Sequence, residues 1–372
     1  MQWLSLASRQ EELDVALSEI AMAMGELAPH LVLVFASAHH LRDPARLAGG
    51  IQARWPAVVA GCSGGGIIGG GREWEEGPTL VVMAAELPNV EVRAVHVTTP
   101  IGLSKAVGLG SDMQPVFLVL ADPASIDAQA LATAMDHRWA GCAKFGGLAS
   151  GDDRVLFCGA EAHREGAVVV SLAGDVEGET VVAQGCRPLG PIFTVTKARR
   201  NVLVELDGRS ALLALEEALT GMAAEERALF RRSPLVGLAA DPEFARPGDF
   251  LVRNLVGLDR AMGVIGVGWP VEEGATIQFH ARDAAFAAQE LGDLLSRRRG
   301  PTPDAALLFS CLGRGHRLFG RPDHDSRILA KHLGPIPIGG FFCAGEIGPV
   351  RNRTFVHGYT SAVGLLRGRG WD

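Results

Sequence analysis

The sequence predicts an α/β protein with two domains and mixed β-sheets, and three observations support this. The chain has 372 residues, which is long for one hydrophobic core and sufficient for two. Short apolar runs typical of buried strands alternate with amphipathic segments typical of helices. Three distant stretches also repeat one order: apolar strand, helix, strand, glycine-rich turn, further apolar strand. We interpret them as degenerate copies of one α/β unit.

The first predicted domain spans residues 1–220. Ser8 and Glu11 have the spacing of a capping box before an amphipathic helix over 13–27. Asp43-Pro44 predicts the start of a second helix, which runs to about Trp55. The predicted strands before the pattern restarts are 31–35, 57–62, 80–85 and 90–97, the last two as a hairpin across Pro88-Asn89. The second copy begins with a strand at 116–120 and a helix that follows Asp122-Pro123.

The second predicted domain spans residues 221–372, after a change to polar, helical composition. It is expected to begin with a β-meander, continue with a helix over 283–298, and then repeat the strand–helix–strand order. The runs assigned to the meander are 235–239, 250–255, 262–267 and 275–280. The final copy has strands at 305–310 and 336–342 around a helix at 326–332.

Each copy has a glycine-rich turn after its second strand. The turns are Gly61 to Gly69, Gly146 to Asp152, and Gly340 to Gly348. Glycine allows a sharp turn or a close approach of the backbone that a side chain would block. If the copies pack together, we expect the three turns to lie near one another.

Composition excludes several classes of function. The net charge is −7 with dispersed charges, which argues against a nucleic-acid binder. The six cysteines have no zinc or redox-pair spacing, so we expect a reducing compartment, no metal and no cofactor. No signal-peptide pattern and no apolar run long enough for a bilayer are present, which predicts a cytoplasmic protein without membrane insertion.

Three motifs in the chain suggest sites that their context does not support. Gly61-Cys62-Ser63-Gly64-Gly65 matches a nucleophile elbow, and Gly64 to Gly69 matches a dinucleotide fingerprint. Both need a helix directly after the turn, and the six glycines among residues 64–71 disfavour a helix there by roughly 6 kcal/mol. The third set is His316, His324 and His332, with Cys311 and Asp325 nearby. An eight-residue spacing interrupted by Pro322 does not keep three ligands on one face.

The C-terminal segments carry a recognisable signature. They read Phe309 to Gly315, then Gly340-Phe341-Phe342-Cys343-Ala344-Gly345-Glu346-Ile347-Gly348-Pro349, then Thr354 to Thr360. Together with Ala60 to Ser63 and Gly147 to Asp152, they resemble the FIST family, whose domains occur alone, fused to bacterial signal-transduction modules, and in a eukaryotic F-box protein. The resemblance covers nearly the whole chain and implies a sensory, ligand-binding module with no established catalytic set.

Glu346 and Arg314 are the centre of the predicted site. A buried carboxylate needs a partner, and Arg314 lies at the matching end of the preceding strand. A structural ion pair and a ligand site both remain open; in the second, Glu346 meets a ligand amine and Arg314 a ligand carboxylate. Arg253 is a second candidate cation or a solvent-facing strand residue.

The other candidates surround this pair in the sequence pattern. Cys311 and Cys343 end adjacent apolar runs and are either inert buried thiols or include a reactive one, whose pKa Arg314 would lower and for which His357 would act as base. The predicted ligand-binding set is completed by four more residues: Tyr359, Thr360, Ser63 and Gly345.

We therefore interpret the chain as an intracellular signal-transduction protein that senses an amino-acid-like metabolite, with signalling proteins as further expected partners. Two alternatives stay open. One is an enzyme with Cys343 or Ser63 as nucleophile, and the other is a non-catalytic interaction scaffold.

Overall fold

The computed structural model describes residues 1–103, 107–108, 114–241 and 249–370, which form two compact units. Unit 1 comprises Met1–Val182, Leu291–Val356 and Thr360–Asp372, and unit 2 comprises Ala183–Glu290 and His357–Tyr359. Unit 2 is therefore inserted into the chain of unit 1. The boundary expected between residues 220 and 221 lies within unit 2, at the end of helix α5 (Ala211–Gly221).

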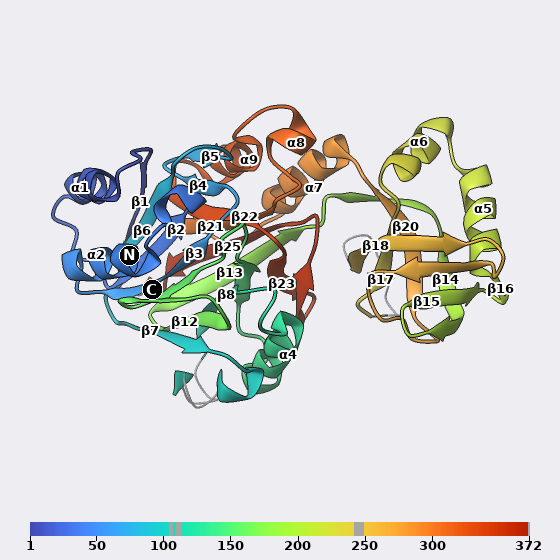
Figure 1. The fold of residues 1–372 in the computed structure, drawn as a ribbon, viewed down its shortest axis with the longest axis horizontal. Helices are drawn as coiled ribbons and strands as arrows, with labels where there is room; N and C mark the ends of the chain where they lie inside the picture. The colour runs from blue at the N-terminus through green and yellow to red at the C-terminus, as the bar shows by residue number, and fades with distance from the viewer. Residues whose placement is uncertain (104–106, 109–113, 242–248, 371–372) are drawn as a thin grey trace. The chain divides into compact units, whose positions relative to one another are not determined.

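Unit 1 contains three copies of one chain path, which confirms the repeat read from the sequence (Figure 1). Repeat 1 comprises β1 (Gln2–Ser8), α1 (Leu13–Met24), β2 (Leu31–Ala36), η1 (Ala38–His40), α2 (Pro44–Arg54), β3 (Val58–Ser63), β4 (Ile67–Gly69), β5 (Arg72–Trp74) and β6 (Leu80–Glu86). Repeat 2 comprises β7 (Val90–Val97), η2 (Pro100–Gly102), β8 (Val116–Ala121), α4 (Ala128–Arg138), β9 (Lys144–Leu148), β10 (Leu156–Cys158), β11 (Glu161–His163) and β12 (Ala167–Gly174).

Repeat 3 is interrupted by unit 2. It comprises β13 (Val176–Ala183), then α7 (Ala284–Ser296), which begins in unit 2 and ends in unit 1, and then β21 (Ala305–Cys311), α8 (His316–Phe319), α9 (His324–Leu333), β22 (Ile338–Cys343), β23 (Glu346–Val350), β24 (Arg353–His357) and β25 (Ser361–Gly368).

The three six-stranded sheets have one strand order, in which each repeat lends a hairpin to another repeat. The orders are β1-β6-β2-β3-β10-β11, β7-β12-β8-β9-β23-β24 and β13-β25-β21-β22-β4-β5. The first four strands of each sheet come from one repeat, and the last two are the hairpin of another. In each sheet the central pair is parallel and is joined by a connection that contains a helix. The exchange of hairpins links the three repeats into one body.

One glycine position recurs in every repeat. Gly61, Gly146 and Gly340 lie on the second strand of the parallel pair. A Cβ atom on any of them would come within about 2 Å of a carbonyl oxygen on the neighbouring strand. Gly146 and Gly340 also have φ angles of 157° and 150°, which L side chains rarely adopt. The fold therefore requires glycine at this position.

The main core of unit 1 is shared by the three sheets, and helices cover their outer faces. Phe35 and Phe309, from two repeats, both pack on Phe341, with ring centroids 5.5 and 5.7 Å apart. Phe145 of the remaining repeat stacks on Phe309. Outside, α1 and α2 cover the first sheet and α4 covers the second.

Unit 2 is built around one antiparallel sheet of seven strands. Its elements are β14 (Cys186–Arg199), β15 (Val202–Leu206), β16 (Arg209–Ser210), α5, α6 (Ala224–Arg232), β17 (Leu235–Ala239), β18 (Phe250–Asp259), β19 (Val264–Val267) and β20 (Thr276–Arg282). The long strand β14 pairs with both β20 and β15, so the sheet curves back on itself. Phe193 and Phe279 of the sheet pack with Phe230 of α6 in its aromatic core, and α5 contributes to the same core.

Three sequence expectations require correction. Ser8 does not cap a helix, because it is the last residue of β1 and pairs with Leu80; α1 begins after Glu12. Strands β6 and β7 exist but do not form a hairpin, since they belong to different sheets. The meander holds for β17, β18 and β19, whereas β20 pairs with β17 and β14.

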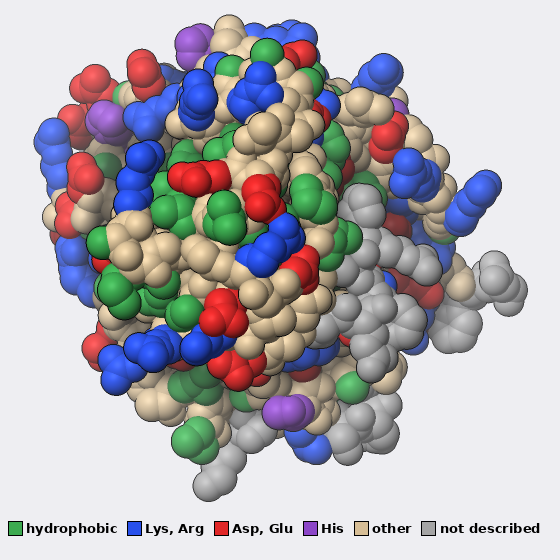
Figure 2. All heavy atoms as spheres, turned by 90° about the vertical axis from the view of Figure 1, so that its right-hand side faces the viewer, with side chains coloured by type: hydrophobic (Ala, Val, Ile, Leu, Met, Phe, Trp, Pro, Cys, Tyr) green, Lys and Arg blue, Asp and Glu red, His purple; other side chains and the backbone are tan. Residues whose placement is uncertain are grey.

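The described surface carries mixed charge. On the face shown in Figure 2, acidic and basic side chains are interspersed with apolar ones. Among the described residues, no helix is both long and apolar enough to span a bilayer.

Candidate functional site

The three glycine-rich turns meet in unit 1, as the repeat pattern predicted. The backbone of each repeat reaches the next through an equivalent hydrogen bond: Ser63 N–H to Val155 O (2.9 Å), Leu148 N–H to Gly345 O (2.7 Å) and Phe342 N–H to Gly66 O (2.9 Å). The Ser150 hydroxyl accepts from Gly65 N–H at 2.8 Å and donates to the carbonyl of Phe342. A candidate site near these turns is therefore held by all three repeats.

Ser63 is part of this junction. It is buried, its hydroxyl donates to Ser150 O at 3.2 Å, and it accepts from Val155 N–H at 3.1 Å. The chain continues from Ser63 into the hairpin β4–β5, so the helix that a nucleophile elbow or a dinucleotide fingerprint requires is not there. These contacts support a structural role for the Ser63 side chain.

Cys311 and Cys343 lie opposite each other in the parallel register of β21 and β22. Leu312 N–H donates to Cys343 O at 3.0 Å, which closes the loop after β21 over the end of β22. Burial raises the pKa of the Cys343 thiol well above its usual value, and the nearby Glu346, Cys62 and Cys311 raise it further. Cys343 is thus a protonated, buried thiol, whereas Cys311 is half-buried.

Glu346 is a fully buried carboxylate at the start of β23. Ile67 and Leu156 occupy the same position in the other two repeats. The equivalence follows from register, because each of the three pairs with the residue that follows the recurring glycine: Cys62, Gly147 or Phe341. One repeat therefore carries a carboxylate where the other two bury an aliphatic side chain.

Glu346 also accepts a backbone hydrogen bond for which a serine hydroxyl is the acceptor in the other two repeats. Its Oε2 accepts from Thr360 N–H at 3.0 Å. At the equivalent N–H groups of Thr79 and Gly166, the acceptors are the hydroxyls of Ser37 (2.9 Å) and Ser125 (2.8 Å). A neutral hydroxyl is therefore sufficient for this bond in the same fold.

Arg314 lies close by, in the loop after β21, and is also fully buried. It forms a bidentate pair with Asp325 of α9, at 2.8 and 2.9 Å, which the sequence did not predict. Asp325 further accepts from Ser310 Oγ (3.1 Å) and lies 2.9 Å from His324 Nδ1. Burial alone would raise the pKa of Asp325, but Arg314 and His324 outweigh it and hold this pKa well below its usual range.

Thr360 and Gly345 connect these groups through their backbones. Thr360 O accepts from Cys311 N–H at 3.0 Å, while its N–H binds Glu346. Gly345 O accepts from Leu148 N–H. The structure therefore gathers six predicted residues of unit 1 at the ends of β21 and β22: Cys311, Arg314, Cys343, Gly345, Glu346 and Thr360. We call these six residues, with Asp325, the strand-end cluster.

The other three predicted residues, Arg253, His357 and Tyr359, belong to unit 2. The Arg253 guanidinium lies 4.5 Å from the Trp269 ring centre and donates to Val252 O at 3.0 Å. The Tyr359 hydroxyl bonds the Asn254 side chain, and Arg282 lies over its ring at 5.2 Å. His357 is buried. Trp269, Asn254 and Arg282 are contacts that sequence reasoning missed, because they come from segments distant in the chain that meet only in the folded unit.

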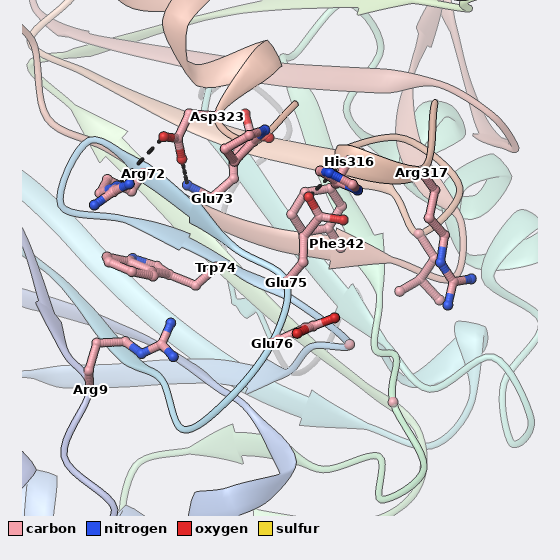
Figure 3. A pocket seen from close by; sticks show the side chains of 14 residues that line it. Arg9, Arg72, Glu73, Trp74, Glu75, Glu76, His316, Arg317, Asp323 and Phe342 are labelled. Carbon is pink, nitrogen blue, oxygen red and sulfur yellow. Dashed lines mark hydrogen bonds and ion pairs between the residues drawn. The ribbon is translucent and has the colours of Figure 1, made fainter. Parts of the chain in front are cut away.

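A hollow of about 810 Å³ also lies in unit 1, lined by parts of the glycine turns, β5 and α8 (Figure 3). None of the ten predicted site residues lines it. The described residues contain no cluster of His, Cys, Asp or Glu suited to a metal ion. His324, from the rejected histidine set, instead stacks on Phe319 and bonds Asp325.

This architecture defines a two-unit α/β protein with a buried, charged cluster at the strand ends of a threefold repeat. Family models match along most of the chain: the FIST N domain over residues 30–209 and the FIST C domain over residues 211–349. The chain belongs to the FIST family, whose domains are sensory modules of signal transduction.

Individual proteins also match the chain. The uncharacterized protein Rv0628c of Mycobacterium tuberculosis is 37% identical over 93% of this chain and 94% of that protein. The uncharacterized protein Mb0898c of Mycobacterium bovis is 35% identical over 96% of each. The F-box/LRR-repeat protein At5g63520 of Arabidopsis thaliana is 27% identical over 43% of this chain and 32% of its own length.

Proposed function

We propose that this protein senses an amino-acid-like small molecule inside the cell, and that the strand-end cluster recognises it. Glu346 would bind the ligand ammonium and Arg314 the ligand carboxylate. The observation that carries the proposal is the difference among the repeats: Glu346 stands where Ile67 and Leu156 stand in the other two copies.

The physical argument concerns the free energy of burying a charge. Moving a carboxylate out of water is unfavourable by several kcal/mol unless charges and hydrogen bonds compensate it. The bond to Thr360 N–H does not require a charge, since serine hydroxyls make it in the other repeats. A carboxylate at this position is therefore an acidic group that the shared fold does not require, and we assign it to ligand recognition.

Arg314 is suited to the opposite end of such a ligand. Asp325 holds the guanidinium in one orientation through two hydrogen bonds. A guanidinium that is already oriented binds a carboxylate at a lower cost in conformational entropy. The half-buried Cys311 and the 40%-exposed Leu312 mark the side from which a ligand would enter. In this proposal a signalling protein reads the ligand-bound state.

The contacts give no support to the nucleophile alternative. The Cys343 thiol is fully buried with a raised pKa, and a thiol rather than a thiolate is a poor nucleophile. The Ser63 hydroxyl is engaged in the turn junction. We therefore advance sensing alone.

A thermal-shift screen of amino acids, polyamines and organic acids tests the proposal. A ligand present at 100 times its Kd stabilises the folded state by about 2.7 kcal/mol. We expect at least one amino-acid-like compound to raise the Tm of the wild type but not that of Glu346→Gln, which keeps an acceptor for Thr360 N–H without the charge. The exposed Glu26→Gln is the matched control. If every compound that raised the Tm of the wild type raised that of Glu346→Gln equally, Glu346 would have no part in recognition.

A further inference from the structure

The hollow in unit 1 is lined by none of the residues of the strand-end cluster, although its lining residue Leu312 donates to Cys343 O, and it has features of a binding site of its own. We call it the turn hollow. Gly65 and Gly151, from two of the glycine turns, and Phe342 at the end of β22 form part of its lining. Its volume of about 810 Å³ lies within the range of pockets that bury small ligands, roughly 300 to 1,000 Å³.

Three of its carboxylates are engaged by the protein. Glu75 accepts from His316 N–H at 2.7 Å and fills the space beside Gly315. Glu73 accepts from Ser326 N–H at 2.6 Å. Asp323 accepts from Glu73 N–H at 2.8 Å and lies 3.6 Å from the guanidinium of Arg72. These acids hold the hairpin β4–β5 against α8 and α9, so they build the walls of the hollow.

Arg9 is held in place at one end of the hollow. Its guanidinium lies 4.5 Å from the centre of the Trp74 ring, and Arg72 lies 4.9 Å from the same centre. Gly77 gives Arg9 room, since a Cβ there would stand 2.5 Å from Nη2. A guanidinium stacked on an indole has lost much of its conformational freedom before a ligand arrives.

Glu76 and Arg317 complete the charged lining. Both are exposed, and no hydrogen bond or ion pair engages their side chains within the part of the chain that the structure describes. In the view of Figure 3, the carboxylate of Glu76 lies between the guanidinium groups of Arg9 and Arg317. In this view one carboxylate that the described residues do not engage therefore stands between two guanidinium groups.

We propose that the turn hollow binds an amine that carries two carboxylates, either an acidic amino acid or a short acidic peptide. The ligand ammonium faces Glu76, and its carboxylates face Arg9 and Arg317. Charge-assisted hydrogen bonds to carboxylates are among the stronger polar contacts in proteins, and Arg9 is already oriented. The proposal is independent of the role given to Glu346.

Isothermal titration calorimetry with the dipeptide Glu-Gly as probe tests this site. Its amino-terminal ammonium lies between a side-chain carboxylate and a carboxyl terminus. Gln-Gly lacks one carboxylate, the amide of Glu-Gly lacks the other, and N-acetyl-Glu-Gly lacks the ammonium. We expect each change to weaken binding by about tenfold, as loss of one hydrogen bond to a charged group does.

The matching protein variants are Arg317→Gln, Arg9→Gln and Glu76→Gln. These positions are exposed, so we expect the variants to fold, with Glu-Gly binding about tenfold weaker. The exposed Arg321→Gln and Glu26→Gln are charge-matched controls outside the lining and should bind as the wild type does.

Three results would overturn the assignment. They are the absence of Glu-Gly binding at millimolar concentration, equal binding of Gln-Gly and Glu-Gly, and wild-type affinity in all three variants. Glu346→Gln separates the two sites, because it should leave this binding unchanged. If Glu346→Gln abolished Glu-Gly binding while Arg317→Gln did not, the dipeptide would occupy the strand-end cluster and not the turn hollow.

Discussion

Repeats 1 and 2 share a fold with repeat 3 but not its chemistry. All three have the same strand order, the same glycine opposite a neighbouring carbonyl, and the same hydrogen bonds between turns. At the first position of the lent hairpin, repeats 1 and 2 bury Ile67 and Leu156, whereas repeat 3 buries Glu346. Because the backbone is the same, the fold itself does not demand the carboxylate.

The connection between the two parallel strands of repeat 3 also contains a buried arginine, which the connections of the other repeats lack. In repeat 3 it buries the pair Arg314–Asp325. The connections of repeats 1 and 2, residues 37–57 and 122–143, bury no arginine. Two copies thus serve as an internal reference for the third, and they show that the same backbone path forms without a buried Glu at the position of Glu346 and without a buried arginine in the connection.

The largest effect is expected from placing the carboxylate of repeat 3 in repeat 2. Leu156→Glu should lower the free energy of unfolding by about 4 kcal/mol, because the new charge is buried among apolar neighbours without a partner. Leu156→Met, which keeps volume and polarity, should cost below about 1.5 kcal/mol. Urea unfolding measures both. A Leu156→Glu protein as stable as the wild type would show that this position tolerates a charge. The presence of Glu346 in repeat 3 would then need no functional explanation.

Substitution of the recurring glycine tests whether the three repeats share the same steric requirement at this position. Gly340→Ala should lower the free energy of unfolding by about 3 kcal/mol, since the added Cβ meets Leu308 O at 1.9 Å on a backbone with φ of 150°. Gly61→Ala and Gly146→Ala should behave alike. Gly49→Ala is the control: it lies in α2 with nothing within 4 Å of the new Cβ and should stabilise by about 1 kcal/mol. Unequal losses at the three sites would contradict the equivalence of the repeats.

The buried carboxyl group of Glu73, on β5 in the sheet of repeat 3, predicts a dependence of stability on pH. Burial raises the pKa of Glu73 to about 7, and the neighbouring Asp325 and Asp323 raise it too, against the hydrogen bond from Ser326. The folded state therefore holds this proton more tightly than the unfolded state, so stability from Glu73 is full below pH 4.5 and is lost as pH rises through 7. Between pH 5 and 7 the ionisation of Glu73 should lower the free energy of unfolding of the wild type by about 2 kcal/mol, and Glu73→Gln should not show this decrease.

Chemical denaturation at several pH values checks this, with the difference between variant and wild type isolating Glu73 from other groups. Identical pH profiles for the two proteins would show that Glu73 is ionised alike in both states.

The smallest change in stability is expected at Glu346 itself. Glu346→Gln retains an oxygen acceptor for Thr360 N–H and removes a buried charge, so the free energy of unfolding should stay within about 1 kcal/mol of the wild type. Loss of more than about 3 kcal/mol would instead identify Glu346 as half of a structural ion pair. Urea unfolding without added ligand distinguishes the two outcomes.

Much of the local structure followed from the sequence. Apolar runs marked the buried strands, and Asp43 before Pro44 marked the start of α2, where its side chain accepts from Arg46 N–H at 3.0 Å. The repeated order of strand, helix, strand and glycine turn predicted that the turns converge. These features depend on residues close together in the chain, so propensity and periodicity capture them.

Strand pairing was beyond the reach of the sequence. Nothing in residues 67–74 shows that β4 and β5 join the sheet of repeat 3, because backbone hydrogen bonds are the same for any partner strand. The N-terminal strand β1 was missed for a related reason: its apolar and polar residues do not alternate clearly, and pairing with β6 decides its conformation.

The sequence by itself determined the repeating unit, its glycine turns and the buried ends of β21 and β22, where Cys311 and Cys343 lie in register. Only the tertiary structure decided which charges meet there. Asp325 reaches Arg314 because α8 and α9 fold back over the strand ends, and Arg9 and Arg317 line one hollow although 308 residues separate them. Contacts of this kind depend on how the three repeats exchange hairpins, and that exchange minimises the free energy of the whole unit rather than of any one segment.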